Sequence, residues 1–180
     1  TPTLSHGRVY TFGATGILNV LDADDGTVVW SRNAATDTGV EIPPWALADS
    51  PLVIDDAVIV AAAGKLASYD LATGTPRWFG PDGGDGYNSP HSLTIDGVAQ
   101  VLFMSEAGAI SVSPDDSTLL WEHSWPGGTR IVQPALIADG DLLISAGEGS
   151  GGTGIRRITV ASKPGGWTVK ERWTSIRLKP

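Results

Sequence analysis

Y-D-L-A-T-G-T-P-R-W, at residues 69–78, is the clearest of four related phrases in this chain. The others are L-D-A-D-D-G-T-V-V-W at 21–30, V-S-P-D-D-S-T-L-L-W at 112–121 and a more divergent G-G-W-T-V-K-E-R-W at 165–173. Each phrase ends in a tryptophan, and the intervals are 48, 43 and 52 residues between Trp30, Trp78, Trp121 and Trp173. A repeat of about 40–50 residues with strand-forming residues inside it is typical of a β-propeller blade.

The second repeat predicts the strands of one blade most clearly. Four short runs, L-V-I-D, A-V-I-V-A-A-A, L-A-S-Y-D-L and T-P-R-W, begin at residues 52, 57, 66 and 75. Turns rich in Asp and Gly separate the runs, and such residues favour tight turns between strands. The repeat therefore predicts a four-stranded antiparallel meander.

The other repeats follow the same order, with a proline before each first strand: Pro2, Pro51, Pro90 and Pro134. We therefore expect an all-β chain forming a single propeller segment over residues 1–180. Its four blades are expected at approximately 1–32, 50–80, 89–123 and 133–175. The four blades are interpreted as half of a propeller of 7–8 blades, completed by further blades or by a second copy of the chain.

The tryptophan of each repeat lies on the expected outermost strand of its blade. A large ring there can cover the neighbouring blade and hold two sheets together. The alternative is that each ring fills the core of its own sheet. The recurrence of the turn before the ring favours the first interpretation, and the predicted blade-docking residues are Asp22, Gly26, Trp30, Asp70, Thr73, Gly74, Trp78, Trp121 and Trp173.

Composition narrows the classes of function. The chain has no cysteine, which excludes disulfides and thiolate metal sites. Residues 1–154 contain 19 acidic and five basic side chains, whereas residues 155–180 contain one acidic and seven basic side chains. The net negative charge of residues 1–154 argues against nucleic-acid binding. No apolar run is long enough to predict a membrane span. The basic end is interpreted as a solvated face of edge strands, with a partner-binding patch as the alternative.

The pattern A-x-D-x-x-T-G-x-x-x-W resembles the signature of the pyrroloquinoline-quinone-like propeller repeats. Residues 69–78 match it through Asp70, Thr73, Gly74 and Trp78, and the resemblance covers essentially the whole chain. The family includes quinoprotein alcohol and glucose dehydrogenases. It also includes non-enzymatic relatives, among them a periplasmic lipoprotein that assists outer-membrane β-barrel assembly. The resemblance therefore implies the fold and leaves the activity open.

No catalytic constellation accompanies the repeats. His6, His91 and His123 have no metal-ligand spacing, and the Asp pairs lie in expected turns. The resemblance implies that the dehydrogenases hold their quinone between a tryptophan and a disulfide of adjacent cysteines, beside a calcium or lanthanide ion. This chain has no cysteine, and its few asparagines form no recognisable ligand cluster. We therefore expect no cofactor, and pyrroloquinoline quinone with calcium only under the dehydrogenase alternative.

The candidate functional surface is the face that collects the connections between blades and the second turn of each blade. Long loops on a rigid scaffold are common binding sites, and aromatic and Arg side chains are typical binding hot spots. The candidate residues are Trp45, Tyr87, Asn88, His91, Trp125, Arg130 and Gln133. Alanine at Trp45 or Arg130 is expected to weaken binding with little loss of stability. The alternative is that Trp45 and Trp125 pack beneath their own loops.

The favoured function is a non-catalytic scaffold or binding module of an exported bacterial protein, located in the periplasm or outside the cell. It would bind a protein partner or a small ligand through the inter-blade face. The alternative function is part of a quinone-dependent alcohol or sugar dehydrogenase. The lack of adjacent cysteines favours the first.

Overall fold

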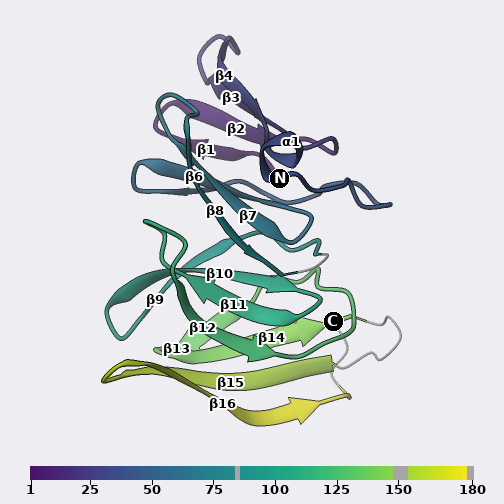
Figure 1. The fold of residues 1–180 in the computed structure, drawn as a ribbon, viewed down its shortest axis with the longest axis vertical. Helices are drawn as coiled ribbons and strands as arrows, with labels where there is room; N and C mark the ends of the chain where they lie inside the picture. The colour runs from purple at the N-terminus through teal and green to yellow at the C-terminus, as the bar shows by residue number, and fades with distance from the viewer. Residues whose placement is uncertain (84–85, 148–153, 178–180) are drawn as a thin grey trace.

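The computed structural model of this chain describes residues 1–83, 86–147 and 154–177. Four separate antiparallel sheets, each of four strands in sequence order, follow one another along the long axis of the molecule (Figure 1). This arrangement confirms the predicted all-β propeller fold. We number the sheets as blades 1 to 4 from the N-terminus.

Blades 1 and 2 are built from strands of three to seven residues. Blade 1 comprises β1 (Thr3–Ser5), β2 (Arg8–Phe12), β3 (Ile17–Asp22) and β4 (Val28–Asn33). Blade 2 comprises β5 (Leu52–Ile54), β6 (Ala57–Ala62), β7 (Lys65–Asp70) and β8 (Pro76–Asp82).

Blades 3 and 4 repeat this order. Blade 3 comprises β9 (His91–Ile95), β10 (Val98–Ser105), β11 (Gly108–Val112) and β12 (Leu119–Ser124). Blade 4 comprises β13 (Ala135–Ala138), β14 (Asp141–Ala146), β15 (Gly154–Lys163) and β16 (Gly166–Ser175). The last two strands have ten residues each, so blade 4 ends in a longer hairpin than the others.

The connection between blades 1 and 2 contains a short helix, α1 (Ala34–Thr38). The side chain of Asn33 caps its first turn by accepting a hydrogen bond from the Thr36 backbone N–H, and Gly39 ends it with φ of 69°. Later in the same connection the backbone makes a single turn, in which Ala46 N–H donates to the Pro43 carbonyl at 2.8 Å.

The core lies between the blades, where facing sheets contribute alternate side chains. Tyr10, Leu18 and Val20 of blade 1 form one buried cluster with Val58 and Val60 of blade 2. Corresponding clusters join blade 2 to blade 3 and blade 3 to blade 4. Each blade is therefore stabilised mainly by its neighbours, as in other repeat proteins.

The same β-bulge precedes the repeat tryptophan in every blade. Trp30 pairs with Val20 while Val28 pairs with Leu21, so Val29 is an extra residue in β4. The registers of β8, β12 and β16 make Arg77, Leu120 and Arg172 the corresponding extra residues. The bulge turns Trp30, Trp78 and Trp121 toward the following blade, and the same bulge identifies Trp173 as their structural equivalent.

Two of the tryptophans hydrogen-bond to the next blade. The indole N–H of Trp30 donates to the Leu71 carbonyl at 3.2 Å, and that of Trp78 donates to the Pro114 carbonyl at 2.9 Å. Both carbonyls lie in the third turn of the receiving blade, between its third and fourth strands. We call this contact the blade joint.

The joint differs at blade 4. Trp121 packs toward blade 4, but its indole N–H donates to Gln100 Oε1 of its own blade at 2.7 Å. The reason is that β15 and β16 continue beyond the level where the other blades make their third turn, to a hairpin closed by Lys163 and Gly166. Among the described residues, no third-turn carbonyl of blade 4 therefore accepts from Trp121.

We predict that Trp78→Ala lowers the free energy of unfolding by about 3–5 kcal/mol, because it removes a buried ring and its interblade hydrogen bond. Urea unfolding followed by circular dichroism measures the change. Trp45→Ala is the matched control, since 74% of the Trp45 side chain is exposed. A loss below about 1 kcal/mol for Trp78→Ala would show that the ring does not hold the blades together.

Candidate functional site

The described part of the inter-blade face consists of the connections at residues 34–51, 83, 86–90 and 125–134, which lie against the second turns of the blades. Backbone hydrogen bonds fix them there: Leu47 N–H donates to Ala14 O, Gly83 N–H to Gly64 O and Gly147 N–H to Thr129 O, at 2.9–3.1 Å. The Gly-rich second turn of blade 4 lies largely outside the described residues. The connections are therefore held in defined positions despite their irregular backbone.

The seven candidate residues of this face do not share one environment. Trp45 and Gln133 are exposed, and Tyr87 and His91 are half-buried. Asn88, Trp125 and Arg130 are buried. The structure therefore divides the predicted set into surface residues and interior residues of the same connections.

Two of the surface residues, Trp45 and Tyr87, lie on consecutive connections that carry further exposed apolar side chains. The rings of Trp45 and Tyr87 lie 5.5 Å apart between their centroids. Asn88, next to Tyr87, donates its side-chain N–H to the Val132 carbonyl at 2.8 Å, which brings the third connection alongside. Exposed large side chains on these three connections, together with the half-buried Tyr87, make up what we call the apolar row: Ile42, Trp45, Tyr87, Ile131 and Val132.

The interior residues of the third connection form a cationic cluster around Trp125. The guanidinium carbons of Arg130 and Arg156 lie 4.6 and 4.2 Å from the centre of the Trp125 ring. Arg130 is 1% exposed and donates to the carbonyls of Ser105 and Trp125. Burial, and then the charge of Arg156, lowers the pKa of Arg130 to about 10. Arg130 holds the connection to blade 3, and the expectation that it belongs to an exposed face was wrong.

His123 joins this cluster from β12. Its Nε2 atom lies 3.0 Å from Arg156 Nη1, and Arg156 also pairs with Glu171 at 3.3 Å. Burial and the charge of Arg156 lower the pKa of His123, so the imidazole is neutral at neutral pH and can accept a hydrogen bond from Arg156. The cluster is therefore a polar seam between blades 3 and 4.

Asp49 is a residue that the sequence reasoning missed. It is 2% exposed, and neither carboxylate oxygen has a hydrogen-bond donor among the described residues. Burial raises the pKa of Asp49 to about 8. Its position two residues before Pro51 matches that of Asn88 before Pro90, and the connections touch where Ser50 N–H donates to Ser89 Oγ at 2.8 Å. This repeated spacing of a polar residue before a proline could have identified Asp49 from the sequence.

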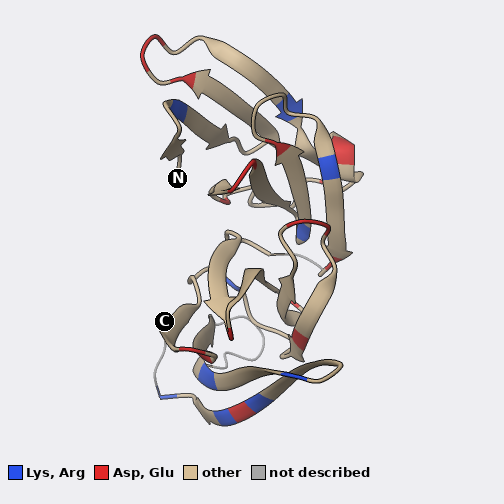
Figure 2. Ribbon diagram, turned by 90° about the vertical axis from the view of Figure 1, so that its left-hand side faces the viewer, with Lys and Arg blue, Asp and Glu red and all other residues tan. Residues whose placement is uncertain are grey.

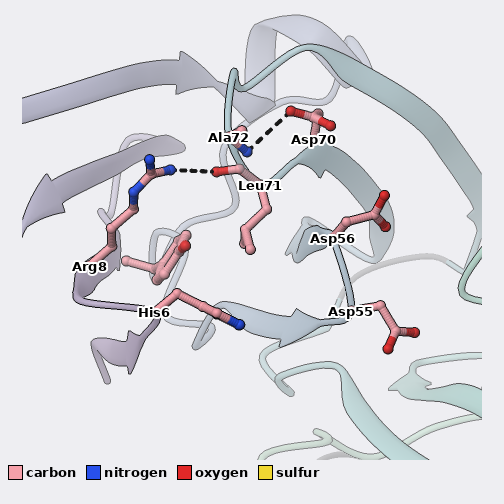
Figure 3. Close-up of a pocket in the computed structure, with 8 residues that line it drawn as sticks. His6, Arg8, Asp55, Asp56, Asp70, Leu71 and Ala72 are labelled. Carbon is pink, nitrogen blue, oxygen red and sulfur yellow. Dashed lines mark hydrogen bonds between the residues drawn. The ribbon is translucent and has the colours of Figure 1, made fainter.

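A groove of about 320 Å³ lies on the opposite face, between blades 1 and 2 (Figure 3). Arg8 reaches across it to donate to the Leu71 carbonyl at 3.0 Å, the same carbonyl that accepts from Trp30. In Figure 3 the carboxylates of Asp55 and Asp56 point away from Arg8, so the charged groups do not converge on a ligand position. The groove is the outer side of a blade joint.

Charge is distributed unevenly over the molecule. Figure 2 shows basic residues along β15 and β16, whereas acidic residues gather at turns of the other blades. Within the described ranges, no group of three His, Asp or Glu side chains could hold a metal ion. No helix among those residues is long and apolar enough to cross a membrane.

We predict that Asp49→Asn raises the free energy of unfolding by a few kcal/mol near pH 7. In the wild type, the folded carboxyl stays protonated up to about pH 8, whereas the unfolded carboxyl ionises near its ordinary pKa of 3.8. Wild-type stability should therefore fall as pH rises between these values, by up to about 1.4 kcal/mol per pH unit.

The measurement is urea unfolding of both proteins at several values between about pH 5 and pH 8. The difference between the two stabilities should be smallest at pH 5 and should widen toward pH 8. A constant difference across that range would mean that Asp49 does not change its protonation on unfolding.

We predict that Arg130→Met destabilises the fold by about 2–3 kcal/mol, because two backbone carbonyls lose their buried donor. Arg77→Met is the control, since Arg77 pairs with Asp56 at the surface and its removal should cost less than about 1 kcal/mol. Thermal unfolding of both variants measures the difference. Equal losses would contradict a clamping role for Arg130.

Comparison with known proteins agrees with the geometry. The family described as outer membrane protein assembly factor BamB matches residues 1–175. Over 77 residues the chain is 31% identical to the outer membrane protein assembly factor BamB of Shewanella oneidensis, covering 42% of this chain and 17% of that protein.

Solved structures show the same fold. BamB from Moraxella catarrhalis superposes with a TM-score of 0.63 at 14% identity, over 88% of this chain and 45% of that one. A europium-containing methanol dehydrogenase superposes with a TM-score of 0.65 at 14% identity, over 96% of this chain and 41% of that one. The chain thus spans less than half the length of these relatives. It belongs to the BamB family of propeller proteins, which confirms the resemblance to pyrroloquinoline-quinone-like repeats.

Proposed function

We propose that this chain is a non-catalytic propeller scaffold that binds a protein partner through the inter-blade face. The observation that supports this most directly is the apolar row, in which 74% of Trp45 is exposed beside Tyr87. Exposing a large aromatic ring has a free-energy cost that burial by a partner would recover.

The connections that present the row are suited to binding. Pro43 and Leu47, on either side of Trp45, are buried, and the hydrogen bonds of the connections to the second turns hold the backbone in place. A rigid platform loses little conformational entropy when a partner binds. Trp45 and Tyr87 would then act as anchors, because aromatic side chains at the centre of an interface supply most of the binding energy.

Family membership supplies the cellular setting of the proposal. The relatives that share the repeat are described as assembly factors for outer membrane proteins. We propose the same compartment for this chain, the periplasm, and as partner either an outer membrane protein or another assembly factor.

The likeness to a methanol dehydrogenase raises the alternative of a quinone enzyme. The residues of this chain do not fit that cofactor as the family resemblance describes it. The chain has no cysteine for the adjacent-cysteine disulfide, and the described residues bring no three acidic or imidazole groups together for its metal ion. Asp49, the buried carboxyl of the inter-blade face, is mainly protonated at neutral pH and is a poor metal ligand in that state.

The alternative is separated from the scaffold by adding pyrroloquinoline quinone and calcium to the purified chain. A quinone absorbance change together with dye-linked alcohol oxidation would support the dehydrogenase. Binding without oxidation would leave the chain a quinone carrier and count against both functions.

We predict that a photoreactive phenylalanine at Trp45 crosslinks to an outer membrane protein or an assembly factor in the envelope of a Gram-negative host. The same substitution at Leu119, an exposed residue on the outermost strand of blade 3, is the control. Mass spectrometry identifies the products. Equal crosslinking at both positions, or products restricted to unrelated abundant proteins, would contradict the proposed binding face.

A further inference from the structure

A second groove lies on the inter-blade face itself, beside the connection between blades 1 and 2. Four of its lining residues, 38–41, end α1 and continue into the connection, and the others are Ala63, Lys65 and Asp82 of blade 2. Its volume is about 390 Å³. Because one water molecule occupies about 30 Å³, this is room for one long side chain together with several waters. We call it the polar groove.

The α1 side of the polar groove is held in a defined shape. Asp37 ties the helix to both blades, because it accepts from Arg32 Nη2 of β4 at 2.8 Å and from the Tyr69 hydroxyl of β7 at 3.0 Å. Gly39 then ends the helix, and a Cβ atom added to it would meet no atom within 4 Å. The groove is therefore formed and open before any partner binds.

The charged groups of the polar groove give it a net negative charge. Its lining contains two acidic residues, Glu41 and Asp82, and one basic residue, Lys65, which donates to the Thr38 carbonyl at 3.5 Å. The Glu41 side chain is exposed and makes no hydrogen bond or ion pair among the described residues. The groove also belongs to the part of the chain, residues 1–154, that has 19 acidic and five basic side chains. A cationic group is therefore attracted to it and an anionic group is repelled.

The polar groove continues directly into the apolar row. Glu41 is followed by Ile42, the first residue of the row, and Trp45 lies four positions after Glu41. A chain spans at most about 3.3–3.6 Å per residue, so the Cα atoms of Glu41 and Trp45 are at most about 14 Å apart. An extended segment of a partner covers the same distance with about four residues. One short segment can therefore reach both the groove and the exposed tryptophan.

We propose that the polar groove binds a Lys or Arg side chain of the protein partner, carried within about four residues of the apolar side chain that covers Trp45. The cationic group pairs with Glu41, and the charge of Asp82 adds to the attraction. This inference rests on the proposed function, because it specifies the kind of partner segment that the inter-blade face selects. It also orients that segment, with its basic residue on the α1 side of Trp45.

Charge variants of the protein with photoreactive phenylalanine at position 45 test the inference in the same envelope. Glu41→Lys should lower the yield of the crosslinked product about threefold to tenfold, because an attraction becomes a repulsion. Lys65→Met should raise the yield, because it removes the positive charge of the groove. Glu122→Lys, the same charge change on the exposed outer strand β12, is the matched control and should leave the yield unchanged. Circular dichroism confirms that each variant is folded.

The attachment site on the partner gives an independent measurement. Mass spectrometry after chymotryptic digestion should place the modified partner residue within about four positions of a Lys or Arg. Photoreactive phenylalanine at Val40, which lines the polar groove, should capture the same segment, with the attachment site closer to its basic residue.

A product at position 45 whose yield does not respond to Glu41→Lys and Lys65→Met would overturn the inference and leave the proposed function in place. An equal loss of product in Glu122→Lys, or an attachment site with no basic residue in that span, would overturn it in the same way. Crosslinking at position 45 no stronger than at Leu119 would instead contradict the proposed function, and the inference with it.

Discussion

The hydrogen bond from a tryptophan indole to a third-turn carbonyl of the next blade is the contact on which the regularity of this fold depends. Three local features must coincide for it to form: a bulge before the ring, a turn with positive φ at its fifth residue, and a small residue where the ring lies. Gly74 meets the last two conditions under Trp30, because any Cβ would collide with the ring. The conserved positions of the repeat phrase are therefore the residues that form this contact.

Fixing the outer strands in this way leaves the opposite face free to vary. There the connections between blades have little sequence in common beyond a proline before each first strand and, in two of them, a polar residue two positions earlier, and their residues serve different purposes. Asn88 bridges to the next connection and Arg130 clamps its own loop, while Trp45 stays at the surface. A face whose backbone is held by hydrogen bonds to the second turns can present an apolar row without depending on that row for its own stability.

The predictable part of the structure was the part that is periodic. Trp78 and Gly74 recur with their turns, so blade, strand order and ring direction could be inferred. The burial of Arg130 and Asp49 could not be inferred from the sequence. It depends on which neighbouring segment covers each connection, and the repeat pattern contains no information about that. The spacing of Asp49 from Pro51 is visible in the sequence. It can be interpreted only once the structure shows Asn88 at the same distance before Pro90, buried and hydrogen-bonded.

Blade 4 shows that the joint can be replaced, and this makes the retention of Trp173 informative. Trp121 donates to Gln100 instead, and the seam to blade 4 is held by apolar packing, by the Arg156–Trp125 contact and by Asp96, which accepts from the Ser162 backbone. A blade that has lost its receiving turn has nevertheless kept the bulge and the ring of the joint. β16 thus preserves the bulge and the ring that form a blade joint elsewhere, with the Trp173 ring 40% exposed.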